Sequence, residues 1–334
     1  MSELPAISIR VSGAVEPRRC VELAKAADED GFAALWFAEN PFQRGVLATA
    51  GACAAATRRV RIGVGVVNPY MRHPAQIAMD FAALDELSGG RAILGIGSGI
   101  AGALQRVGFD TSRPVAAVRE AVEIVRAMLS GQSVTMNGQV FKIDAARLGF
   151  PARPLPIYMA AASERALRVC GQIADGLIVS NMTPPRMTRR MAAIVVDAAA
   201  EAGRPKPWFV QYVPCAVADD REIARAAVKA AIGEALTLLW PVGDIWPLRR
   251  EVAVAESGIP RRDFVFALER LRRGEPAAEV IDERFVVAFA IAGTAQECLQ
   301  QAKRYRETGV DELALTFAGK QATEGITQLA TALP

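Results

Sequence analysis

Short apolar runs alternate with longer stretches of helical periodicity along most of the chain, and this alternation constrains the fold more than any other feature. It is typical of a parallel sheet in which each strand is followed by a helix. The predicted strands are Ala6–Val11, Ala34–Ala38, Val60–Val67, Ala92–Gly97, Ile157–Ala161, Gly176–Ser180, Trp208–Ala218 and Glu312–Phe317. Because eight parallel strands close a barrel, the sequence predicts an α/β fold of the TIM (β/α)8-barrel type.

The helical periodicity is clearest between Pro114 and Ser130. Apolar residues recur there at helical spacing, at Val115, Val118, Val122, Val125 and Leu129. The residues between them include Arg119, Glu120 and Arg126, so we expect one buried face and one solvated face. Pro74 predicts the start of another helix, which runs through Leu87, because proline suits the first helical turn.

Two segments exceed what a minimal barrel needs. Residues 131–156 contain an Asn137-Gly138 turn between alternating residues, which predicts a small hairpin inserted before the fifth strand. Residues 239–287 combine tryptophans and prolines with a charged helical stretch, and we expect them to cover one barrel end and to shape a substrate pocket. The sequence therefore predicts a single domain over residues 1–334 with these two insertions.

Composition excludes several classes of protein. The 334-residue chain has a net charge of +3 with acidic and basic residues intermixed, which argues against a nucleic-acid partner. The sequence has no run of eighteen apolar residues and no pattern of a secretory leader, so we expect a cytoplasmic protein without membrane contact. The five cysteines are scattered and form no CxxC pair, so we expect reduced thiols and no metal site.

Polar residues follow several of the predicted strands, at the barrel end where TIM-barrel enzymes hold their catalytic groups. These residues are Arg10, Ser12, Glu39, Asn40, Asn68, Tyr70, His73, Ser98, Gly99, Ser163, Arg165 and Asn181. The chain has one histidine, which disfavours both a hydrolytic triad and a multi-histidine metal centre. The remaining hypothesis is that an organic cofactor carries the reaction.

The residues alone leave alternatives open at three of these places. The glycine-rich run Gly95–Gly99 fits a nucleotide-binding loop or close backbone packing at the barrel mouth. His73 fits a proton donor or an ordinary loop residue. Ser163 is a good helix N-cap, and Arg165 fits a phosphate contact or a solvated surface position.

Several motifs, taken together, resemble one superfamily. They are Asp28-Glu29-Asp30-Gly31-Phe32 with Leu35-Trp36, Arg61–Tyr70 with His73-Pro74, Leu84–Arg91, Leu94–Gly99, and Pro156–Ala161 with Ala174-Asp175-Gly176. This combination resembles the luciferase-like oxidoreductases that depend on flavin or on the deazaflavin F420. Within that superfamily the chain is most similar to the methylenetetrahydromethanopterin reductases.

The resemblance implies that FMN or coenzyme F420 binds at the C-terminal end of the barrel. It implies a bulge in the third strand, made by a non-prolyl cis peptide at Gly65–Val66, that presses against the middle ring of the cofactor. The positions that match the superfamily's cofactor contacts are Gly65, Val66, Asn68, Ser98, Gly99, Ala162, Ser163, Arg165 and Ala166.

The acidic residues that the resemblance leads one to expect are replaced. Arg10 stands where the reductases carry a glutamate on the first strand, and Ile100 stands where they carry an aspartate after the fourth. The Asp-His pair of the sugar-phosphate dehydrogenase branch reads Glu39-Asn40 here. The candidate catalytic residues are accordingly Glu39, Asn40 and His73.

The predicted function is transfer of hydride, or activation of oxygen, on a small organic substrate. Three alternatives remain at this stage: a monooxygenase that takes reduced FMN from a partner reductase, a non-catalytic flavin-binding relative, and a true methylenetetrahydromethanopterin reductase. The resemblance also implies a homodimer through the early barrel helices, where Gly51–Ala56 would allow close packing.

Overall fold

The computed structural model describes residues 3–240 and 247–333. The chain divides into two compact units: unit 1 comprises residues 1–7, 179–193 and 209–334, and unit 2 comprises residues 8–178 and 194–208. Residues 241–246, which belong to the predicted insertion 239–287, lie outside the described residues. The prediction of a single domain stays a prediction.

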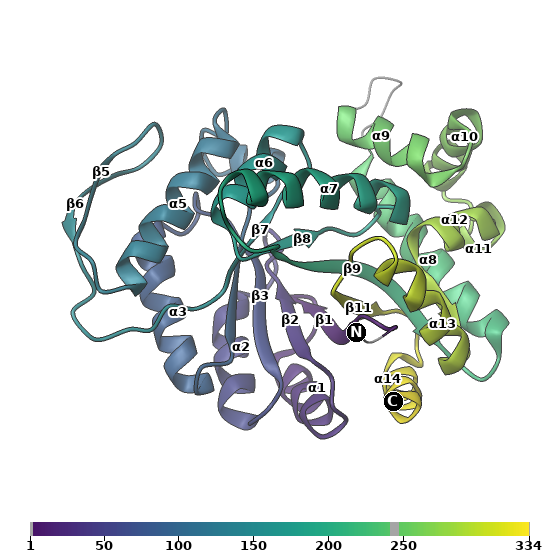
Figure 1. The fold of residues 1–334 in the computed structure, drawn as a ribbon. Coiled ribbons are helices and arrows are strands. Elements are labelled where there is room, and N and C mark those ends of the chain that lie inside the picture. The colour runs from purple at the N-terminus through teal and green to yellow at the C-terminus, as the bar shows by residue number, and fades with distance from the viewer. Residues whose placement is uncertain (1–2, 241–246, 334) are drawn as a thin grey trace. The chain divides into compact units, whose positions relative to one another are not determined.

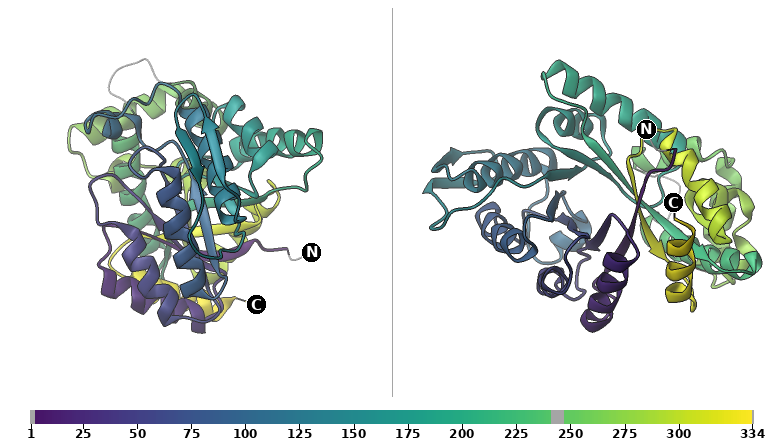
Figure 2. Two further views of the ribbon diagram at one scale, coloured as in Figure 1. Left: turned by 90° about the vertical axis from the view of Figure 1, so that its left-hand side faces the viewer. Right: turned by 60° about the horizontal axis from the view of Figure 1, so that its bottom comes forward.

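Unit 2 is built on parallel strands that pair in the order in which they occur along the chain. They are β1 (Ala6–Ser12), β2 (Ala34–Ala38), β3 (Arg61–Val67), β4 (Ala92–Ile96), β7 (Ile157–Ala160) and β8 (Gly176–Val179). The helices after them are α1 (Pro17–Glu29), α2 (Val46–Ala56), α3 (Pro74–Ser88), α4 (Ala101–Gln105), α5 (Pro114–Leu129) and α6 (Glu164–Ile173). Figures 1 and 2 show α1, α2 and α3 on the outer side of the strands.

In unit 1 the long strand β9 (Trp208–Val217) pairs in parallel with β10 (Ile291–Gly293) and β11 (Glu312–Phe317). Helix α7 (Pro185–Glu201) precedes β9. The remaining helices are α8 (Arg221–Leu239), α9 (Leu248–Ser257), α10 (Arg261–Arg272), α11 (Ala277–Val280), α12 (Glu283–Phe289), α13 (Ala295–Arg306) and α14 (Ala322–Ala332). Figure 1 shows α9 and α10 in green and α11 and α12 in yellow-green, and α10, α11 and α12 contact α8.

The eight predicted strands all form, with ends that differ from the predicted ends by at most one residue, and they alternate with helices as a TIM barrel requires. The fold class predicted from the sequence is confirmed. Strand β10 was not predicted, because three residues are too few to show a period. It is paired with the C-terminal half of β9, from Cys215 to Val217.

The predicted hairpin also forms, from the antiparallel strands β5 (Val134–Asn137) and β6 (Lys142–Ala146). Asn137 is the last residue of β5 and pairs with Lys142, so the turn covers residues 138–141 and begins one residue later than predicted. Figure 1 shows the hairpin beyond α5.

Glu120 corrects the prediction of a solvated helix face. Its side chain belongs to α5 but is 7% exposed, because its carboxylate accepts hydrogen bonds from the amides of Gln139, Val140 and Phe141 at 2.7, 3.0 and 2.9 Å. A buried carboxylate needs such donors. The hairpin turn is thereby fixed to α5, a long-range contact that periodicity within α5 cannot reveal.

The ends of the strands opposite the predicted site are tied together by Arg91. Its guanidinium donates to the carbonyl oxygens of Ala54, Thr57 and Val60 and to the Thr57 hydroxyl, and its Nε donates to the carbonyl oxygen of Ser88. These acceptors come from the end of α2, the start of β3 and the end of α3. The motif that ends in Arg91 therefore has a structural role, at the N-terminal ends of β3 and β4.

Candidate functional site

The C-terminal half of β3 is irregular at the predicted place. The peptide bond between Gly65 and Val66 is cis, as the resemblance implied. The pairing of β3 with β4 shifts there: Gly65 lies opposite Gly95, but Val67 lies opposite Ile96. Val66 is the extra residue of this bulge and is half-buried.

The glycines of β4 leave the space that the bulge occupies. A Cβ atom on Gly95 would lie 2.9 Å from the Gly65 Cα, and one on Gly97 would lie 2.8 Å from the Val66 Cγ2 and 3.3 Å from the Ala160 Cβ. The distances of 2.9 and 2.8 Å are shorter than real Cβ contacts, so a larger residue at either position would have to displace the bulge. Of the two interpretations of this run, close backbone packing is the one that the structure shows at Gly95 and Gly97.

Asn68 and Gly99 lie side by side beyond the bulge. Gly99 has a φ of +70°, which favours glycine, and a Cβ atom there would lie 3.1 Å from the Asn68 Cβ. The Asn68 Oδ1 accepts from the Met71 amide at 2.9 Å, and its Nδ2 has no acceptor among the described residues. Ser98, between Gly97 and Gly99, is half-buried. The structure thus brings these three predicted cofactor residues into one place.

Glu39 is engaged in an ion pair. Its two carboxylate oxygens lie 2.8 and 3.0 Å from the Arg72 Nη1, and the Arg72 Nε lies 3.4 Å from the Asp80 carboxylate. The loop after β2 is thereby joined to the start of α3. The Asn40 Nδ2 donates to Gln43 Oε1 at 3.2 Å. Both predicted catalytic groups therefore have structural partners in this structure, and a role for Glu39 in proton transfer would require it to leave Arg72.

His73 caps helix α3. Its Nδ1 accepts from the Ala75 amide at 3.2 Å, and the ring lies edge-on to Phe141 with the centroids 5.6 Å apart. Burial lowers the pKa of His73, so the ring stays neutral, as an accepting Nδ1 requires. These contacts give His73 a structural role in α3, and its catalytic role stays a prediction.

The start of α6 fits the predicted phosphate site. Ser163 is the N-cap, and its Oγ accepts from the Ala166 amide at 3.3 Å, which confirms the predicted cap. The amides of Glu164 and Arg165 have no acceptor among the described residues, as is normal in a first helical turn, and are available to an anion. Arg165 is exposed, and Ala162 and Ala166 are small and half-buried.

Tyr70 is one of the polar residues predicted at the barrel end, but the sequence assigned it no role. Its hydroxyl is buried without a hydrogen-bond partner, and its ring lies 6.5 Å from that of Phe109, centroid to centroid. Burial, with the negative charge of Asp110 as a second cause, raises the pKa of Tyr70. The hydroxyl therefore keeps its proton and can donate to a ligand. The sequence places Tyr70 at the end of β3 but cannot show whether its hydroxyl finds a partner.

Exposed apolar side chains also gather on the loops after β2, β3 and β4. They are Phe42, Met71, Ile100, Val107 and Phe109. Phe42 is 62% exposed and adopts a left-handed φ of 60°, and the Arg106 guanidinium lies 5.3 Å above its ring. These residues can be read from the sequence as apolar residues in loops. Strand periodicity does not identify them, because they lie outside the strands.

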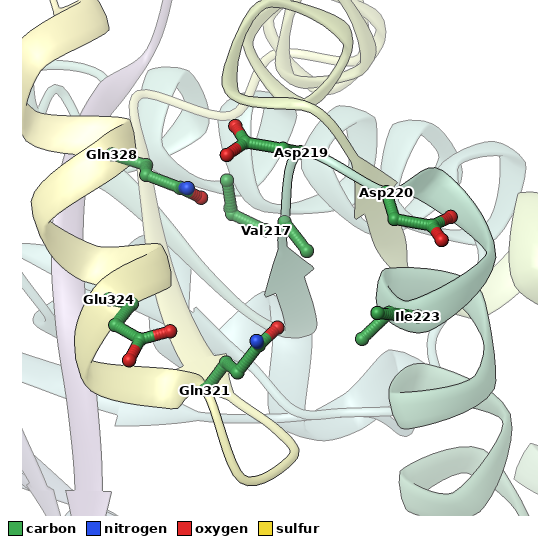
Figure 3. Close-up of a pocket in the computed structure, with 8 residues that line it drawn as sticks. Val217, Asp219, Asp220, Ile223, Gln321, Glu324 and Gln328 are labelled. Carbon is green, nitrogen blue, oxygen red and sulfur yellow. The ribbon is translucent and has the colours of Figure 1, made fainter.

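A separate cavity of about 240 Å³ lies in unit 1, at the C-terminal end of β9. In Figure 3, Gln321, Glu324 and Gln328 extend from α14 and the turn before it, facing Val217 and Ile223. Asp220 also lines it but caps α8, accepting from the Glu222 amide at 2.8 Å. The cavity contains none of the predicted site residues.

Within the described ranges, no three histidine, cysteine or acidic side chains are grouped so that they could hold a metal ion. No helix in that part of the chain is both long and apolar enough to cross a membrane.

Comparison with known proteins decides the family. Residues 4–312 match the model of the luciferase-like monooxygenases. The chain belongs to this family. It is 30% identical over 294 residues to 5,10-methylenetetrahydromethanopterin reductase of Archaeoglobus fulgidus, covering 86% of each chain. It is 31% identical over 238 residues to an F420-dependent glucose-6-phosphate dehydrogenase of Nakamurella multipartita, covering 66% of this chain and 70% of that protein.

Solved structures agree with this family member's fold. The F420-dependent tetrahydromethanopterin reductase of Methanopyrus kandleri superposes with a TM-score of 0.86 at 24% identity, covering 98% of each chain. A monooxygenase of Streptomyces bottropensis superposes with a TM-score of 0.73 at 20% identity, covering 98% of each chain. The predicted superfamily and fold are confirmed, and the predicted class of enzyme, an oxidoreductase dependent on flavin or deazaflavin, is supported.

The cap made by His73 should make stability depend on pH. The folded protein disfavours the imidazolium, so the unfolded chain binds the proton first as the pH falls below the ordinary histidine value of about 6.5. The wild type should therefore lose stability between pH 7.5 and 5.5 relative to His73→Asn, whose cap carries no titrating group. Urea unfolding at both pH values measures the difference, and equal losses in the two proteins would contradict the role.

Proposed function

We propose that this protein is an oxidoreductase that binds F420 or FMN at the C-terminal end of β3 and β4 and acts on a small organic substrate. The observation that carries the proposal is the bulge at Gly65–Val66, lodged against Gly95 and Gly97 in a member of the luciferase-like family. The sequence relatives whose names specify a cofactor include F420-dependent dehydrogenases, and one solved structure of similar fold is a monooxygenase in complex with FMN.

The residues present fit such a cofactor. The bulge approaches β4 closely, because the positions that face it there are glycines. Asn68 has an amide group left to donate, and the first turn of α6 has unpaired amides for a phosphate. Gly65, Val66, Asn68, Ser98 and Gly99 would hold the ring system, and Ala162, Ser163, Arg165 and Ala166 would hold the phosphate. The bound cofactor would supply the hydride or the activation of oxygen.

The chain's own contribution is position and exclusion of water. The apolar loop residues Phe42, Ile100 and Phe109 provide a surface on which a planar ligand can be dehydrated. The Glu39–Arg72 pair fixes the loop after β2 against α3. Two of the predicted catalytic residues, Glu39 and Asn40, lie on that loop. Tyr70, which is not one of them, adds a protonated hydroxyl that has no hydrogen-bond partner in the described structure.

Cofactor binding can be tested without knowing the substrate. Titrating the apoprotein with FMN and with F420, followed by fluorescence, should give saturable binding of at least one. Gly97→Ala should weaken that binding tenfold or more, because its Cβ would lie 2.8 Å from the Val66 side chain and displace the bulge.

The matched control is Gly102→Ala in α4, where an added Cβ meets no atom within 4 Å. It should bind as the wild type does. Absence of binding of both FMN and F420 to the wild type would refute the proposed function, and equal binding by the two variants would refute the role of the bulge.

Tyr70→Phe should separate stability from function. Removing a buried hydroxyl that has no partner should leave the free energy of unfolding unchanged or raise it by up to about 1 kcal/mol. If the hydroxyl donates to a bound ligand, the same change should weaken cofactor binding or turnover by about tenfold. Urea unfolding and the fluorescence titration measure the two effects. A loss of stability with unchanged binding would show that Tyr70 only supports the loop.

A second candidate activity, reduction of methylenetetrahydromethanopterin, is favoured by the 30% identity to the Archaeoglobus enzyme over 86% of each chain. Arg10 and Ile100 replace the acids expected of that activity. Arg10 lies half-buried in β1 opposite Trp36, and Ile100 is exposed before α4. We therefore rank a different small substrate first. Monooxygenase chemistry with a reductase partner, a non-catalytic flavin-binding role and a cytoplasmic location stay predictions.

We also propose a homodimer through the outer faces of α2 and α3. Small and apolar side chains are exposed side by side there, at Ala48, Ala52, Ala55, Met79, Ala83 and Leu87. A face of this kind on two adjacent helices is unusual for a monomer.

Light scattering should give the mass of two chains, and Ala52→Glu should reduce it to that of one, because the charge would be buried without a partner. The control, Ala226→Glu on the exposed side of α8, should leave the mass unchanged. A wild-type mass of one chain would refute the dimer.

A further inference from the structure

Two neighbouring arginines in unit 1 have no acidic partner among the described residues. Arg249 and Arg250 lie in the first turn of α9, and both are partly buried. The Arg249 guanidinium donates through Nη2 to the hydroxyl oxygen of Ser180. No carboxylate lies within ion-pairing distance of either guanidinium in the part of the chain that the structure describes. The acidic residues of α9 bind elsewhere: Glu251 pairs with Arg261 at 3.2 Å, and Glu256 pairs with Arg190 at 2.6 Å.

The environment of the two arginines favours the binding of an anion. Burial lowers the pKa of Arg249, and burial together with the charge of Arg249 lowers the pKa of Arg250 to about 10. Arg250 lies 4.7 Å above the ring of Trp240, which holds it by a cation–π contact but does not neutralise it. Two like charges that repel each other in a partly buried place are stabilised by a bound anion.

Ser180, the hydrogen-bond partner of Arg249, lies in the loop after β8. It directly follows β8, at the strand end where TIM-barrel enzymes hold their substrates. Its oxygen accepts from Arg249, so its own proton remains to donate. The next residue, Asn181, has an amide oxygen buried without a partner, and Met182 adopts a left-handed φ of 60°. Unpaired buried polar atoms and an unusual backbone in one loop are typical of a ligand site.

We propose that Arg249, with Arg250 and Ser180, binds an acidic group of the substrate, an oxyanion of the phosphate or carboxylate class. A guanidinium presents a planar set of N–H donors that matches such an anion, and the Ser180 hydroxyl can donate to the same group. As a substrate site, this inference rests on the proposed function. The predicted insertion at residues 239–287 would then contribute charge to the site as well as shape.

The test uses the apoprotein and inorganic phosphate as probe, with acetate in a parallel titration, at constant ionic strength. Calorimetry should show saturable phosphate binding to the wild type that Arg249→Gln weakens at least tenfold. Arg190→Gln is the matched control: it removes one exposed charge of unit 1 that already has a partner, and its binding should equal that of the wild type. Tighter phosphate than acetate binding would assign the phosphate class, and the reverse would assign the carboxylate class.

The first turn of α6 can also bind phosphate, so Arg165→Gln is titrated in parallel. This variant should still show the phosphate binding that Arg249→Gln weakens. Arg249→Lys keeps the charge but loses the planar set of donors, so it should weaken phosphate binding about threefold to tenfold. This variant still tests the inference if Arg249→Gln does not fold. The inference fails if the wild type binds neither anion, or if Arg249→Gln and Arg249→Lys both bind as the wild type does. Because no cofactor is added, these outcomes do not depend on whether FMN or F420 binds.

Discussion

The candidate cofactor site depends on the close approach of β3 and β4. Gly95 and Gly97 let the backbone and side chain at the bulge come within distances that any larger residue would prevent. Asn68 and Gly99 then meet just beyond the bulge, and Ala160, at the end of β7, lies against Gly97. The shape of the site is therefore set by missing side chains in unit 2, and its polar groups are few. A site made this way positions a planar molecule better than it transfers protons, which agrees with a cofactor that carries the reaction.

The charged groups around this place mostly serve structure. Glu39 is paired with Arg72, His73 caps α3, and Arg91 ties the opposite strand ends together. A carboxylate or imidazole near a barrel end is often read as an acid or base of catalysis. Here the two groups at the barrel end fix loops, whereas the Tyr70 hydroxyl is buried without a partner in the described structure. Unmet hydrogen-bonding capacity identifies candidates for ligand binding better than residue type does.

The sequence predicted the strands well because each is a short apolar run bounded by breakers, and it predicted the Ser163 cap because that signal is local. It also placed the irregular peptide at Gly65–Val66 through resemblance. It did not predict that Glu120 is buried, because the amides that surround its carboxylate come from a hairpin about twenty residues away. For the same reason it could not separate Tyr70 from its neighbours: a free hydroxyl is a property of the folded surroundings. The roles of the individual site residues remain predictions.

The Glu120 carboxylate has a further consequence for motion. Three amides of the β5–β6 turn are bound to a side chain in the middle of α5, so swinging the hairpin away as a lid would break three hydrogen bonds to one carboxylate. The hairpin should therefore move with α5 as one rigid piece. A ligand that enters unit 2 would therefore meet the exposed apolar side chains of the loops after β2, β3 and β4 and not a moving hairpin, and the loop after β2 is itself anchored by the Glu39–Arg72 pair.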